Sequence, residues 1–192
     1  MVDRNVDYSQ QSSPVSTKCQ DSSGNSFEIR EAKVCDAAEW MAFVCSIAAE
    51  RDRVMAFSDE WPEALEQQET IVQSILDHPG CCLALAVMGG EIIGAVELTG
   101  NRMRRTAHVA SIGMSVHSQH RRRGVGQQLL KYGLMRARKM RLRKLKLSVF
   151  SQNRPAIALY QKAGFRNVGR CVDEVLLTDG SYDDLIHMER RV

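Results

Sequence analysis

The sequence predicts an α/β (α+β) domain in which a mostly antiparallel sheet is flanked by helices. Short apolar or alternating runs, typical of strands, are separated by segments whose apolar residues recur at helical spacing. In addition, Gly89 and Gly90 join two strand-like runs, as the two-residue turn of a hairpin does. In chain order these patterns predict a strand, two helices, three antiparallel strands, a helix, a strand, a helix and the closing strands.

The N-terminal part of the chain is polar. Residues 1–26 are rich in Ser, Gln, Asp and Asn and poor in apolar residues, so we expect a disordered tail. Residues 27–192 are then expected to form a single domain. A chain of 192 residues is long enough for one domain to bury a substantial core.

The first strand is expected at residues 27–30, and two helices follow it. Asp36 with Glu39 three residues later is a capping-box pattern, which predicts the start of the first helix. Pro62 is expected in the first turn of the second helix, where its fixed φ is favourable.

The middle of the chain predicts a hairpin, a strand and a long helix. The hairpin strands are residues 82–88 and 91–98, and a basic loop follows at 100–105. An apolar run at 108–116 predicts the next strand. The amphipathic pattern over 124–140 then predicts a helix.

The C-terminal third alternates again between strand and helix. Residues 144–150 alternate polar and apolar, as a strand does, and a helix is expected at 155–163 with Gly164 as its cap. Three closing strands are expected at 165–169, 172–178 and 184–189.

Composition excludes several classes of function. Apolar residues make up 44% and charged residues 26%, with a net charge of only +3, so we expect a cytoplasmic globular protein with no nucleic-acid partner. No apolar run is long enough to cross a membrane. The six cysteines form no CxxC pair and have no histidine at metal-ligand spacing, so no metal is expected.

The stretch after residue 116 predicts an anion site. Arg121, Arg122 and Arg123 precede Gly124 and Gly126, and a helix pattern begins there. Glycine lets the backbone approach a bulky anion, and the start of a helix offers unpaired N–H groups and partial positive charge. The spacing excludes a P-loop and a Rossmann GxGxxG motif, but it fits a pyrophosphate cradle.

A second motif lies one strand downstream. The sequence LKLSVFSQN ends at Asn153, and AIALYQKAGF follows over residues 156–165. With the R-x-x-G-x-G spacing of Arg121, Gly124 and Gly126, this order resembles the GNAT superfamily of acetyl-CoA-dependent N-acetyltransferases. The resemblance covers roughly residues 27–190.

The resemblance implies a mixed sheet in which the parallel strands after Ser111 and after Lys144 splay apart, with acetyl-CoA inserted between them. Main-chain groups of Met114 and Val116 would then bind the pantetheine. The whole set of cofactor-binding residues implied is Met114, Val116, Arg121, Arg122, Arg123, Gly124, Val125, Gly126, Gln127, Asn153 and Tyr160. From the sequence alone, Asn153 is equally well a helix N-cap.

The resemblance also implies direct transfer of acetyl from acetyl-CoA to an amine, with Tyr160 as the general acid for the leaving thiolate. The position at which some family members carry a glutamate base falls near Ala110, which cannot take a proton. We therefore expect the base to be Glu97 or, as second choice, His108, whose imidazole suits neutral pH. Otherwise the amine loses its proton through ordered water.

The acceptor is less constrained by the sequence. Resemblance to small bacterial enzymes predicts a small amine or amino acid as acceptor. Its carboxylate would be held by Arg102, Arg104 or Arg105, and its ammonium group by Glu97 or Asp183. The alternatives are a protein or peptide N-terminus, as in ribosomal-protein acetyltransferases, and a non-catalytic acetyl-CoA sensor. Homodimerisation is common in the family and stays open here.

Overall fold

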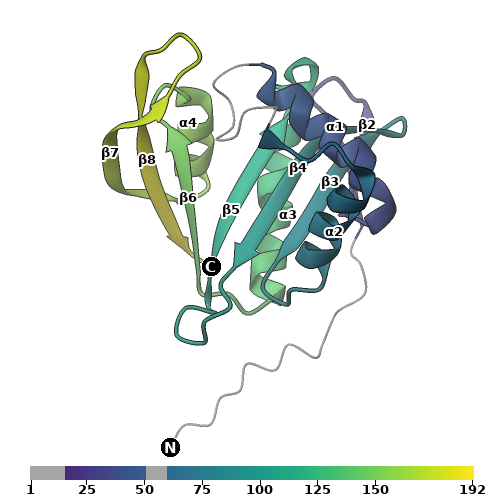
Figure 1. The fold of residues 1–192 in the computed structure, drawn as a ribbon, viewed down its shortest axis with the longest axis horizontal. Coiled ribbons are helices and arrows are strands. Elements are labelled where there is room, and N and C mark those ends of the chain that lie inside the picture. The colour runs from purple at the N-terminus through teal and green to yellow at the C-terminus, as the bar shows by residue number, and fades with distance from the viewer. Residues whose placement is uncertain (1–15, 51–59) are drawn as a thin grey trace, which may run out of the picture.

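The fold is built on an eight-stranded sheet with the order β1-β2-β3-β4-β5-β6-β8-β7 (Figure 1). The computed structural model describes residues 16–50 and 60–192. The strands are β1 (Thr17–Gln20), β2 (Ser26–Glu31), β3 (Cys82–Met88), β4 (Glu91–Gly100), β5 (Val109–Val116), β6 (Lys144–Phe150), β7 (Arg166–Leu176) and β8 (Tyr182–Arg191). Neighbouring strands are antiparallel except β5 and β6, which are parallel.

Helices cover both faces of this sheet. They are α1 (Ala37–Ala48), α2 (Leu65–Leu76), α3 (Val125–Lys139) and α4 (Arg154–Lys162), with short 3-10 helices η1 (Val34–Asp36) and η3 (Ser118–His120). Figure 1 shows α1 and α2 in front of β3 and β4, and α3 behind them. Each layer has its own core: α1 and α2 pack around Leu83 and Leu85, while α3 and α4 pack around Leu129 and Leu145.

The prediction of a disordered tail over residues 1–26 is wrong for its last part. Thr17–Gln20 form β1, which pairs with β2 from Thr17 opposite Ile29 to Gln20 opposite Ser26. The turn between them is held by the Asp21 carboxylate, which accepts the backbone N–H groups of Ser23 and Asn25, both at 2.8 Å. An edge strand that packs only Cys19 against the core needs few apolar residues, so its composition is similar to that of a disordered segment. Residues 1–15 lie outside the described part of the chain.

Most other boundaries agree with the sequence to within one or two residues, with two corrections. Pro62 precedes α2 by three residues instead of lying in its first turn. The expected strands at 165–169 and 172–178 are one strand, β7, with irregular pairing to β8 between Cys171 and Val175. Within this irregular part Asp173 has a φ of 53°, and its N–H is bonded to the Asp184 carboxylate at 2.9 Å.

The feature that positions the site is the separation of β5 from β6. Their parallel pairing covers only three positions and stops at Ser111 opposite Lys146. Beyond that point β5 continues to Val116 and β6 to Phe150 without further pairing to each other. The splayed parallel pair predicted by the resemblance is therefore confirmed. Among the described residues, the helices are too short or too polar to span a membrane.

Candidate functional site

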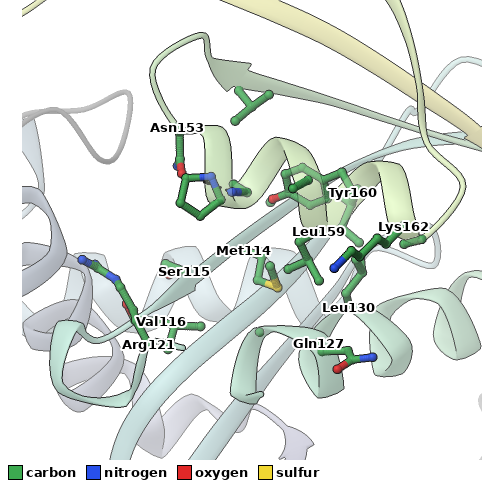
Figure 2. Close-up of a pocket in the computed structure, with 18 of the residues that line it drawn as sticks. Met114, Ser115, Val116, Arg121, Gln127, Leu130, Asn153, Leu159, Tyr160 and Lys162 are labelled. Carbon is green, nitrogen blue, oxygen red and sulfur yellow. Dashed lines mark hydrogen bonds between the residues drawn. The ribbon is translucent and has the colours of Figure 1, made fainter. Parts of the chain in front are cut away.

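A cavity of about 1010 Å³ lies where β5 and β6 separate. Figure 2 shows Met114, Ser115 and Val116 of β5 facing Asn153 and Tyr160 of α4 across it. Ile47 reaches the cavity from α1, and Leu130 and Leu134 reach it from α3 on the other side of the sheet. The cavity is therefore open to groups from both faces of the sheet.

Most of the expected cofactor-binding residues line this cavity. They are Met114, Val116, Arg121, Arg122, Gly124, Gly126, Gln127, Asn153 and Tyr160. Two expected residues do not line it. Val125 is buried in the core, and the carbonyl of Arg123 accepts a hydrogen bond from Ser22 N–H at 2.9 Å, which joins the glycine loop to the β1–β2 turn.

The glycine loop has the geometry of an anion cradle. Gly124 is the N-cap of α3 with a φ of 86°, a conformation that costs other residues about 1–2 kcal/mol. The first turn of this 15-residue helix follows at once, so its N–H groups and the positive end of its dipole lie at the loop. No atom lies within 4 Å of where a Cβ on Gly124 would be placed, so the space beside the loop is open.

Arg121 is already engaged inside the protein. Its Nη1 lies 2.5 Å from Glu50 Oε2 after α1, and its Nε donates to the Val116 carbonyl at 2.8 Å. The main-chain carbonyl of Val116, one of the two residues expected to bind pantetheine through the main chain, is therefore used by Arg121. The same contacts connect the glycine loop, the end of β5 and the end of α1.

The charge of the lining favours an anionic ligand. Within residues 16–50 and 60–192, the charged residues that line the cavity are all cations, namely Arg121, Arg122, Lys131, Lys162 and Arg190. Because Arg121 is neutralised by Glu50, the remaining four supply the excess charge. Lys131 was not singled out by the sequence, although the 3.6-residue period of α3 places it one turn beyond Gln127.

Asn153 and Asp183 act together on the loop between β6 and α4. Asn153 caps α4, its Oδ1 accepting the Ala156 N–H at 3.3 Å. The Asp183 carboxylate is buried and accepts hydrogen bonds from Ser151 Oγ at 2.6 Å and from the Gln152 N–H at 3.3 Å. The structure therefore places Asp183 under this loop, where its oxygens are occupied, and the prediction that it binds a substrate ammonium is wrong.

Tyr160 lies on α4 with 6% of its surface exposed and packs edge-on against Phe165, with ring centroids 5.8 Å apart. Its side chain also borders the cavity (Figure 2). Burial raises the pKa of Tyr160 to about 12, because the charged phenolate is disfavoured away from water. The phenol is therefore protonated at neutral pH.

The two expected bases lie in different places. Glu97 of β4 is paired with Gly113 of β5, which lines the cavity, and its Oε1 accepts the Thr99 hydroxyl at 3.0 Å. His108 precedes β5 at its opposite end, where its carbonyl accepts the Arg143 N–H at 2.8 Å. The structure thus brings Glu97 next to the cavity but does not bring His108 there. Ala110 is fully buried, and Arg102 is exposed after β4.

One polar cluster at the cavity was missed by the sequence reasoning. Ser148 of β6 lines the cavity, and its Oγ lies 2.9 Å from Nδ1 of His187 on β8. Nε2 of the same imidazole lies 3.3 Å from the sulfur of Cys171 on β7. The three residues come from three strands, so no local motif could have shown them together.

Comparison with known proteins defines the class of protein. A model of the acetyltransferase (GNAT) family matches residues 43–165. The chain therefore belongs to the GNAT acetyltransferase family, and it is an acyltransferase of the N-acetyltransferase class.

The relatives agree with this assignment. The L-amino acid N-acetyltransferase AaaT of Escherichia coli K12 is 31% identical over 119 residues, which cover 62% of this chain and 73% of AaaT. A GNAT-family acetyltransferase of Streptococcus pneumoniae superposes with a TM-score of 0.82 at 27% identity, covering 86% of this chain and 99% of that one. The yncA protein of Salmonella typhimurium, solved with its cofactor acetyl-CoA, has the same fold with a TM-score of 0.76 at 17% identity, covering 86% and 93%.

Proposed function

We propose that this protein transfers the acetyl group of acetyl-CoA directly to the primary amine of a small molecule, with a free amino acid as the first class of acceptor. The observation that carries the proposal is the cavity between β5 and β6, which combines the start of α3 with charged lining residues that, in the described part of the chain, are all cations. A pyrophosphate and a further phosphate are the ligand groups that such a site suits. The similarity to AaaT supports an amino acid as acceptor.

The residues of this chain fit acetyl-CoA in three respects. The first turn of α3 and Arg122 supply donors and charge for phosphate, and Lys131 and Lys162 add positive charge along the wall. The strand edges of β5 and β6 beyond Ser111 face each other without pairing, so amide groups of a pantetheine arm can be satisfied there. The cosubstrate supplies an activated acetyl thioester.

Tyr160 is proposed as the general acid. It borders the cavity on α4 and is protonated at neutral pH, so its phenol can give a proton to the departing sulfur. Glu97, beside Gly113 on the α1 side of the sheet, is proposed to attract the ammonium group of the acceptor. Arg102 lies with His108 in the loop between β4 and β5, at the end of β5 away from the cavity, so it has no role in this proposal.

Two measurements test this proposal. A thiol-release assay with acetyl-CoA is run against amino acids, polyamines, aminoglycosides and peptide N-termini, and turnover is expected on amino acids or other small amines. Turnover on peptide N-termini alone would replace the acceptor class. Binding of acetyl-CoA without turnover on any acceptor would favour the sensor hypothesis instead.

The cofactor site is tested by Gly124→Val, measured by calorimetry with acetyl-CoA. A branched side chain is strained at a φ of 86° and would displace the loop N–H groups, so binding should weaken at least tenfold. Gly90→Val, at a positive φ in the β3–β4 turn, is the matched control for backbone strain alone. Equal affinity in wild type and Gly124→Val would contradict the cradle.

A further inference from the structure

We propose that His187, acting through the hydroxyl of Ser148, is the general base that deprotonates the acceptor amine. This inference rests on the proposed acetyl transfer and adds the proton path that transfer requires. Primary amines are largely protonated at neutral pH, and only the neutral amine attacks a thioester, so a proton must leave before or during the attack.

The position of Ser148 makes it the entry point of the path. Along β6, Leu147 and Val149 are buried in the core shared with α3 and α4, whereas Ser148 between them is exposed on the opposite face. Ser148 nevertheless lines the cavity, because β5 has separated from β6 at this level. An amine that approaches from the α1 side of the sheet therefore meets this hydroxyl.

His187 is held in a geometry that suits a base. It is the register partner of Ser148 across β6 and β8, and its Nδ1 lies 2.9 Å from Ser148 Oγ. Its Nε2 lies 3.3 Å from Cys171 Sγ on the far side. With the proton on Nε2, the imidazole donates to the sulfur and presents a bare Nδ1 to the hydroxyl. Cys171 thus acts as a positioning residue that holds the ring and its tautomer.

The surroundings of the imidazole are polar and charged. Cys171 faces His187 from β7, while Lys146 on β6 and Glu189 on β8 lie one register step further along the same face. Glu189 is paired with Lys144 at 2.6 Å, so its charge is partly compensated. Figure 1 shows α4 behind β6 and β8. Ile186 and Met188 pack into the core shared with α3 and α4, so His187 between them lies on the other face of β8.

The proton balance is complete with these groups. The acceptor ammonium gives one proton to Ser148 Oγ, whose own proton passes to His187 Nδ1. The neutral amine forms the C–N bond as the C–S bond breaks, and the sulfur leaves with the electron pair of that bond. Tyr160 protonates the sulfur, the attacking nitrogen gives up its second proton to restore Tyr160, and His187 releases its proton to water.

The test is the pH dependence of kcat/KM for the amine in wild type and in His187→Gln. With an imidazole base, kcat/KM should reach a plateau well below the pKa of the amine, because the rate then no longer depends on the small fraction of free amine in solution. Without the base only the free amine reacts, so kcat/KM should rise roughly tenfold per pH unit up to the pKa of the amine. The wild-type advantage should therefore be about 10²-fold near neutrality and shrink steadily with pH.

Ser148→Ala should give the same pH profile as His187→Gln, and Lys146→Gln, on the same face, should keep the wild-type profile. Acetyl-CoA affinity, measured by calorimetry, should be unchanged in both test variants. Profiles of His187→Gln and wild type that run parallel at all pH values would overturn the assignment while leaving the acetyltransferase intact. If wild type acetylates no amine, the proposed function itself fails, and this inference fails with it.

Two further readouts do not depend on the size of the rate. Side-chain ¹⁵N NMR of the protein should show the neutral His187 ring protonated on Nε2, and Ser148→Ala should shift its Nδ1 resonance. A ring protonated on Nδ1 would overturn the relay. Initial rates varied in both substrates should give intersecting lines, whereas parallel lines would mean that an acetyl-enzyme forms and would overturn a base that acts on the acceptor amine in a ternary complex.

Discussion

Replacing Tyr160 by phenylalanine removes a phenol hydroxyl from a site that is only 6% exposed, while the ring can keep its edge-on contact with Phe165. Burial raises the pKa of Tyr160 to about 12, whereas the unfolded chain has the ordinary value of about 10. Because the folded protein holds this proton more tightly, the associated stability is fully present below pH 10. It is lost as the pH rises from 10 through 12.

The magnitude follows from the two pKa values. A folded-state pKa near 12 and an unfolded-state pKa near 10 predict that Tyr160 alone costs the folded state about 1 kcal/mol between about pH 9 and about pH 11. The free energy of unfolding is measured by urea titration at both pH values for wild type and Tyr160→Phe. Wild type should lose about 1 kcal/mol more than the variant over this interval.

The matched control is Tyr182→Phe, because Tyr182 is 58% exposed at the start of β8. Its loss of stability with pH should equal that of wild type, since an exposed phenol is solvated in both states. If wild type and Tyr160→Phe lose the same free energy between the two pH values, the burial of this phenol does not perturb its ionisation. Tyr160 would then hold its proton no more tightly than a solvated phenol does.

Three more predictions concern the same cavity. Tyr160→Phe should lower kcat about 10²-fold or more while acetyl-CoA affinity changes little, and an unaltered kcat would remove Tyr160 from the chemistry. Asp183→Ala should lower the free energy of unfolding by about 1–3 kcal/mol and raise KM for acetyl-CoA, because it leaves the donors of the β6–α4 loop unpaired. Urea titration and initial-rate kinetics measure both effects, and a raised KM for the amine with unchanged stability would restore the ammonium-binding role of Asp183. Glu97→Gln should raise KM for the amine several-fold at low salt and keep the shape of the pH profile, and a profile that loses its plateau would return the base to Glu97.

The parts of the fold that the sequence predicted well are those that neighbouring residues determine. The β3–β4 turn needs positive φ at two successive positions, and Gly89 and Gly90 have φ of 60° and 92°. The strand at 144–150 alternates because one of its faces is buried, and its predicted bounds coincide with β6. In the same way, the glycine loop could be predicted because strand, turn and helix start follow one another along the chain.

The errors have a common physical cause, which is that a distant segment supplies the missing interaction. β1 is too polar to be predicted as a strand and is held by pairing with β2. The interruption expected between residues 169 and 172 is absent, because β8 pairs with β7 there, with Arg170 opposite Ile186 and Cys171 opposite Leu185. Asp183 was predicted to bind a substrate ammonium group, but its carboxylate is occupied by Ser151 and Gln152 of the β6–α4 loop.

The candidate site also has one part that neighbouring residues determine and one part that depends on distant segments. The proposed phosphate site is formed by one contiguous loop. It could therefore be predicted from the spacing of residues along the sequence, together with the charge of Arg122 and the cap at Gly124. Proton removal depends on Ser148 and His187, which are 39 residues apart and meet only because β8 lies beside β6 in the sheet. Strand alternation can assign each residue to a face, but it cannot give the register between strands, so a base that belongs to another strand is found only in three dimensions. In this chain the buried Ala110 lies near the position where a glutamate base was expected from the resemblance, and it cannot accept a proton. The proton acceptor is therefore to be sought where β6 pairs with β8.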